Sequence, residues 1–280
     1  LPALASELPP TEHIDTVAFN FMKGLAQEIH TGKLSLPSLP EVAIKIRHAL
    51  VEEHTDLGRV VRVIGTDPVL AARIVTAANS AAMRATRPIS DVHSAVHRLG
   101  LQAVYSLAMS TALQQVLYAK IPDKLRSTLK AEWECSVRVA VIAQALARVV
   151  GGCVADEAFL AGLFHNIGKL FILKRAADYP GLLEDDDALQ MVMDAWHNVV
   201  GFALVTHWGV ASDIACAVRD HGASGTGEGA NRLTSVVCLA HRHAGYVLVP
   251  GEQAVRTAPP SAGLELTDAA WAKVVAAART

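Results

Sequence analysis

Apolar residues recur three and four positions apart through most of the chain, which is the spacing of one buried face on an α-helix. Clear examples are the runs 42–50, 57–64 and 92–99, where valine, isoleucine and leucine mark the face. Strict alternation of apolar and polar residues, the pattern of a half-buried strand, never persists beyond a few positions. We therefore predict an all-α protein, built as a compact multi-helix array.

Helix start and stop signals support this prediction. Thr66-Asp67-Pro68 offers a capping side chain followed by proline at the first helical position, and Gly100 ends the run that starts near Ile89. The connections between predicted helices in the first half of the chain are short, as in a packed array without a sheet.

Four regions are distinguished by their composition. A Pro-rich start with an amphipathic helix at about 12–30 forms an N-terminal extension, and we expect this helix to pack on its own chain. A polar link at 121–130 separates two helical blocks, and a segment rich in Pro, Gly and Ser at 248–263 precedes a last helix capped by Thr267. The predicted regions are the extension 1–35, the helical subdomains 36–130 and 131–247, and the linker with its C-terminal helix 248–280.

The stretch from Glu157 to Arg175 stands out, because polar residues interrupt a very apolar helical pattern. It reads EAFLAGLFHNIGKLFILKR, with His165-Asn166 in its middle and Gly168-Lys169 directly after. We predict a single buried helix here. Buried polar side chains need partners or a cavity, because leaving them unpaired costs free energy.

Charge and composition exclude several classes of protein. The chain is 51% hydrophobic with a net charge of −2, and its Lys and Arg residues are scattered singly, so no footprint for nucleic acid is visible. Arg138, Gln144 and Arg148 interrupt the most apolar segment, so we expect no membrane span. Four cysteines lack C-x-x-C spacing and no secretory signal precedes them, which favours a reduced, cytoplasmic protein.

The order of several short motifs resembles that of the HDOD domain, the regulatory relative of HD-type metal-dependent phosphohydrolases in bacterial signalling. The motifs are LPSLPEV from Leu36, the TDP-headed helix ending in Asn79-Ser80-Ala81, the run Ile89–Gly100, AGLFHNIGKL, the W-H-x-x-V-G stretch at Trp196, Trp208 and His221. The resemblance covers about Leu36 to Ala244 and implies two helical subdomains, the C-terminal one HD-like.

Within this resemblance, the metal site of HD hydrolases is degenerate. The family pattern has a His, a His-Asp pair and a distal Asp, and the corresponding positions here are Cys135, His165-Asn166 and His241. Both carboxylates are missing, and Mg²⁺ or Mn²⁺ prefers carboxylate oxygens. We therefore expect no catalytic residues, no bound metal and no other cofactor.

Two alternatives remain open at the level of sequence. Cys135, His165 and His241 form a softer set of donors that suits zinc if they converge, although buried Cys and single His residues are more often plain core residues. Lys169, His197 and His221 could line a retained anion pocket for a nucleotide, whereas the simpler interpretation is a surface lysine with two structural histidines.

The sequence thus indicates a non-catalytic, regulatory signal-transduction protein that acts through contact with a signalling protein partner. One alternative is a metal-dependent phosphohydrolase or phosphodiesterase with altered ligands. A second is a sensor that binds a nucleotide without hydrolysing it. We expect neither nucleic acid nor membrane as a partner.

Overall fold

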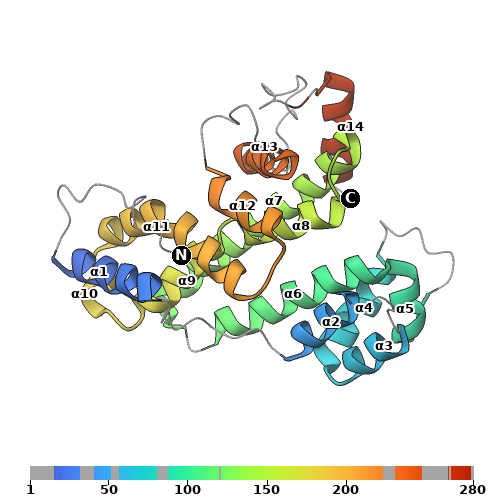
Figure 1. The fold of residues 1–280 in the computed structure, drawn as a ribbon, viewed down its shortest axis with the longest axis horizontal. Helices are drawn as coiled ribbons and strands as arrows, with labels where there is room; N and C mark the ends of the chain where they lie inside the picture. Colours follow the sequence, from blue (N-terminus) through green and yellow to red (C-terminus); the bar gives the residue numbers. More distant parts are fainter. Residues whose placement is uncertain are drawn as a thin grey trace. The chain divides into compact units, whose positions relative to one another are not determined.

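The computed structural model describes residues 16–31, 41–51, 57–80, 88–119, 121–222, 231–247, 264 and 266–278. Every regular element within these ranges is a helix, and the fourteen helices confirm the all-α prediction (Figure 1). The predicted linker at 248–263 lies outside the described residues, as does the Pro-rich start. No helix in the described segments has both the length and the apolar character needed to cross a membrane.

The chain divides into two compact units, which we call the small unit and the large unit. The small unit is Pro37–Ala119, and the large unit combines Leu1–Leu36 with Lys120–Arg279. The small unit holds five helices: α2 (Glu41–Val51), α3 (Leu57–Gly65), α4 (Pro68–Ala78), α5 (Val92–Leu99) and α6 (Leu101–Tyr118).

Local side-chain bonds fix the helix ends of the small unit as the sequence predicts. Asp67 caps α4 by accepting from the backbone amides of Val69 and Leu70, and Pro68 opens the helix. Asn79 follows α4, where its amide accepts from the backbone N–H of Ile89 and donates to the Ile89 carbonyl. Asn79 is thus a tether between two segments of the small unit.

The large unit is organised around its longest helix, α7. Its helices are α1 (Thr16–Thr31), α7 (Asp123–Val150), α8 (Ala155–Phe164), α9 (Ile167–Ala176), α10 (Pro180–Glu184), α11 (Asp186–His207), α12 (Ser212–Asp220), α13 (Arg232–Val247) and α14 (Asp268–Ala278). Helices α8, α13 and α14 pack against α7, and α9 packs against α11 (Figure 1). Asp185 caps α11 by accepting from the Ala188 amide, so the acidic run there has a structural role.

Both terminal helices pack on their own chain, as expected for the N-terminal one. Helix α1 contacts α10 and α11, with Glu28 paired to Arg175 at 2.8 Å and Phe21 against Tyr179. Helix α14, capped by Thr267, packs on α7 and buries Trp271.

Residues 121–130 differ from the sequence-based prediction of a polar link. Helix α7 already begins at Asp123, and the boundary between the two units along the chain falls between 119 and 120. Leu125, Leu129 and Trp133 are buried at a spacing of four, so they form one stripe on a continuous helix. Polar residues between them hid this stripe in the sequence.

The predicted single helix over 157–175 is also wrong, because it is two helices with a break at His165-Asn166. Asn166 has φ −100° and ψ 15°, outside the helical region, and its side chain is committed to a partner on α7. His165 and Asn166 therefore form the junction between α8 and α9. A pattern of apolar residues cannot reveal such a break, since the same face stays buried on both sides.

Helices α9 and α11 cross at glycine. A Cβ added at Gly168 would lie 2.7 Å from the carbonyl carbon of His197 and 2.9 Å from the amide nitrogen of Gly201, both of them backbone atoms. Any side chain there would push the helices apart. This close crossing holds the start of α9 beside His197.

We predict that Gly168→Ala destabilises the large unit by about 3 kcal/mol or more, because backbone atoms cannot move aside cheaply. Gly24→Ala in α1 is the matched control, since its Cβ would meet only the Tyr179 hydroxyl at 4.0 Å, and it should stabilise by about 1 kcal/mol. All four tryptophans lie in the large unit, so their fluorescence in urea titrations measures that unit. Equal unfolding midpoints for both variants would contradict the packing argument.

Candidate functional site

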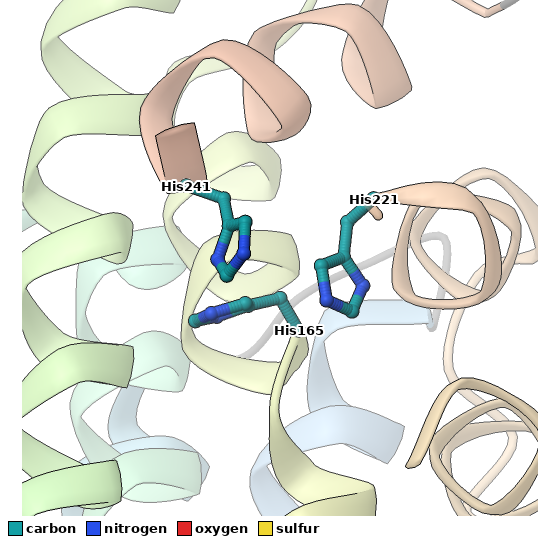
Figure 2. Close-up of side chains that lie close together, drawn as sticks. All are labelled: His165, His221 and His241. Carbon is teal, nitrogen blue, oxygen red and sulfur yellow. The ribbon is translucent and has the colours of Figure 1, made fainter. Parts of the chain in front are cut away.

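Four histidines from separate segments of the large unit meet in its interior. His165 lies at the α8–α9 junction, His197 on α11, His221 directly after α12 and His241 on α13. The ring centroids of His165, His221 and His241 are 4.9–5.1 Å apart, and His197 lies 5.3 Å from His221. We call these four rings the imidazole cluster. Figure 2 shows three of them facing one another from separate helices.

Backbone carbonyls orient three of these rings. His165 Nδ1 lies 2.7 Å from the Gly162 carbonyl, His221 Nδ1 2.8 Å from that of Val218, and His197 Nδ1 2.8 Å from that of Met193. A carbonyl oxygen can only accept, so each of these rings carries its proton on Nδ1. Each carbonyl belongs to the turn just before its histidine, so helical geometry sets the ring orientation.

The interior keeps the imidazole cluster uncharged. Burial lowers the pKa of His165 well below its ordinary value, and the neighbouring imidazoles lower it further. Burial also lowers the pKa of His197 to about 4, helped by the charge of Lys169, and that of His221 to about 3. The pKa of His241 is lowered by burial, then by Lys169 and Arg242.

The side chain of Asn166 bonds to a residue of α7. Its Nδ2 donates to Glu132 Oε2 at 3.0 Å, while its Oδ1 is buried without a hydrogen-bond partner among the described residues. The sequence pattern did not single out Glu132. Glu132 lies one helical turn before Cys135, so both side chains lie on the same face of α7. Because the family pattern assigns residue 135 to the metal site, this spacing could have indicated Glu132 as a second residue near the site.

Cys135 does not join the imidazole cluster. The group of donors close enough to share an ion, within the described residues, consists of His165, His221 and His241. Cys135 is half-buried on α7, and burial together with the charge of Glu132 raises the pKa of its thiol. The zinc set predicted from sequence thus contains two of the three converging residues, with His221 in place of the cysteine.

Lys169 lies beside the imidazole cluster and is paired with a carboxylate. Its ammonium is 3.0 Å from Asp194 Oδ1, and its side chain is only 15% exposed. Its charge acts on His197, His221 and His241. The structure therefore brings the predicted anion-pocket residues Lys169, His197 and His221 together, but with the lysine engaged by Asp194 and the imidazoles neutral.

Comparison with known proteins identifies the fold. The HDOD domain matches residues 36–224 of this chain. An uncharacterized protein from Treponema pallidum (strain Nichols) is 24% identical over 200 residues, and the chain spans 37% of that relative's length.

Several solved structures have a similar fold. A protein from Shewanella amazonensis SB2B, described as a candidate metal-dependent phosphohydrolase, has a TM-score of 0.71 at 23% identity, covering 95% of this chain and all of that one (100%). An HDOD domain protein with unknown function from Geobacter sulfurreducens has a TM-score of 0.64 at 24% identity, with 94% and 96% covered. A candidate signal transduction protein from Marinobacter aquaeolei VT8 has a TM-score of 0.57 at 23% identity, with 94% and 61% covered. At these identities the likeness shows the fold.

We predict that Asn166→Asp destabilises the large unit by about 1–3 kcal/mol at pH 7. Asn166 Nδ2 donates to Glu132 Oε2 at 3.0 Å. The substitution puts a second carboxylate at this place, so a hydrogen bond is replaced by repulsion between two negative charges. Urea titration by tryptophan fluorescence measures the loss. The double variant Asn166→Asp/Glu132→Gln should recover most of it, because glutamine can donate to the new carboxylate. A single variant as stable as the wild type would contradict the pairing.

Stability should also fall as the pH drops below about 6.5. The unfolded histidines take up protons near pH 6.5, whereas folded His197 and His221 do so only at about 4 and about 3. The unfolded state then binds more protons, so each such histidine lowers the unfolding free energy by up to about 1.4 kcal/mol per pH unit in that window. Urea titrations between pH 7 and pH 4.5 in the presence of a chelator measure this slope. His197→Gln should make it shallower, and a flat profile would contradict the buried neutral imidazoles.

Proposed function

This chain belongs to the HDOD domain family, and we propose that it is a regulatory signalling module that controls a protein partner by contact and does not hydrolyse phosphate esters. The observation that carries the proposal is the position of Asn166. Where an HD hydrolase holds its bridging carboxylate, this chain has an amide that donates to Glu132.

The chemistry of the remaining donors supports the absence of hydrolysis. An HD-type reaction uses divalent ions held partly by carboxylates, which lower the pKa of a bound water until it becomes a nucleophile. Here the converging donors within the described residues are three imidazoles. Neutral imidazoles supply no negative charge, and Lys169 adds a positive one nearby. Such a set gives Mg²⁺ or Mn²⁺ little attraction.

The large unit supplies a means of transmitting a change by contact. The imidazole cluster joins the α8–α9 junction, α11, α12 and α13, so a rearrangement in one segment must repack the others. The partner we propose is a protein of cyclic-dinucleotide or two-component signalling in the reducing cytoplasm, where four free thiols are stable. The similar Marinobacter structure, described as a candidate signal transduction protein, agrees with this role.

We predict that the purified chain shows no phosphodiesterase or phosphatase turnover with Mg²⁺, Mn²⁺ or Zn²⁺. The substrates to assay are bis-p-nitrophenyl phosphate, p-nitrophenyl phosphate and cyclic dinucleotides. His165→Ala is the control for contaminating activity, and the rates of the two proteins should be equal. Metal-dependent turnover that His165→Ala abolishes would replace the proposal with a hydrolase of altered ligands.

The same preparation tests the regulatory role. The full chain is used as bait in extracts of the native cell, and each captured signalling protein is purified and assayed for its own output with and without the chain. A dose-dependent change in that output supports control by contact. Thermal shift with nucleotides tests the sensor alternative, because stabilisation that Lys169→Ala removes would favour a nucleotide-binding role instead.

A further inference from the structure

Three ring nitrogens of the imidazole cluster are left without partners in the interior. They are His165 Nε2, His221 Nε2 and His241 Nδ1, each buried and without a hydrogen bond to any described residue. Leaving a buried polar atom unpaired costs about 1–3 kcal/mol. Three such atoms from three segments converge in one place, which calls for a common partner.

The positions of the ring protons leave lone pairs on the nitrogens inside the imidazole cluster. Because His165 and His221 donate from Nδ1 to the carbonyls of Gly162 and Val218, their Nε2 atoms carry lone pairs. A carbonyl that holds the far nitrogen of an imidazole is the usual support of a metal-ligating histidine, since it fixes the tautomer and the direction of the ring. Burial keeps both rings neutral, so no proton competes for the lone pairs near pH 7.

The three donor atoms also lie close enough for one ion. One ring nitrogen from each of the three histidines lies within 4.8 Å of the others. Two nitrogens bound to a tetrahedral zinc at about 2.1 Å each lie about 3.4 Å apart. Side-chain rotations must therefore bring the donors, now up to 4.8 Å apart, closer by up to about 1.4 Å to place all three around one centre. The three rings already lie close together in edge-on contact (Figure 2).

We propose that His165, His221 and His241 bind a single late first-row divalent cation of the zinc type. Three imidazoles without a carboxylate suit zinc, copper or nickel and disfavour magnesium and manganese. The set differs from the HD pattern in three respects: the Asn166 position takes no part, His221 supplies a donor instead of residue 135, and His241 supplies an imidazole where the pattern has a carboxylate.

The ion would act as a clamp between segments. Its ligands come from the α8–α9 junction, the end of α12 and the middle of α13, which are far apart in sequence. An ion that binds only the folded state stabilises it by mass action. This inference goes beyond the proposed function, because a module that acts by contact requires no ion.

Isothermal titration of the chelator-stripped full chain with ZnCl₂, and Co²⁺ absorption in the visible range, test the proposal. We expect one ion per chain and the intense d–d bands of four-coordinate Co²⁺. His165→Ala, His221→Ala and His241→Ala should each weaken binding by more than about 100-fold, which exceeds the typical loss from an outer-shell change. Zinc should also raise the unfolding midpoint measured by tryptophan fluorescence, and this rise should vanish in the three variants.

Two controls separate the proposed set from others. His207→Ala removes an exposed histidine on α11, and Cys135→Ala removes the thiol, so both should bind zinc as the wild type does. The wild-type Co²⁺ spectrum is informative even if a variant fails to fold. Absence of stoichiometric binding would overturn the proposal, as would binding that survives His221→Ala and His241→Ala or is lost in Cys135→Ala. Turnover is measured separately, so binding without hydrolysis supports both proposals, and failure of one leaves the other standing.

Discussion

Desolvation of the imidazole cluster is the constraint on which the large unit depends. Burial solvates a cation poorly, so the pKa values of His165, His197, His221 and His241 are lowered and the rings are neutral. A neutral ring has one N–H to satisfy, and the preceding helical turn supplies a carbonyl for three of them. The other nitrogen of His165 and of His221 is then directed inward. The packing of the helices therefore both keeps the rings neutral and sets their orientation.

The same constraint explains why a carboxylate is absent from the imidazole cluster. An aspartate at 166 would be buried beside the Glu132 carboxylate, and its charge would need an ion to compensate it. Asparagine avoids that requirement, because an uncharged amide can be buried and still donate to Glu132. The junction between α8 and α9 thus carries an amide at the position where the HD pattern has a carboxylate, which is the basis of the non-hydrolytic role proposed above.

Lys169 contributes both to the packing of α9 on α11 and to the charge beside the imidazole cluster. It follows Gly168, whose close approach to α11 places the start of α9 against the backbone of His197. The lysine is paired with Asp194 on α11, one turn before His197. Packing at a glycine and pairing at the next residue together hold α9 and α11 in register. The positive charge near the rings follows from that packing, and it adds to the effect of burial on their pKa values.

The sequence by itself determined the all-α class, most of the helices with the cap of α4, and the family of the fold. Recurrence of apolar residues, Asp67-Pro68 at α4 and Asp185 at α11 are local features, so they can be read without tertiary contacts. It also placed His165 and His241 in one set of candidate ligands, and their rings lie 4.9 Å apart in the structure. Only the tertiary structure decided that the helix breaks at Asn166, that Glu132 holds the amide, and that His221 and not Cys135 completes the trio. The physical reason is that convergence depends on how α8 and α13 pack on α7 and how α12 packs on α8 and α13. Side chains 56 and 20 residues apart in sequence, as 165, 221 and 241 are, meet through that packing, which no periodicity along the chain encodes.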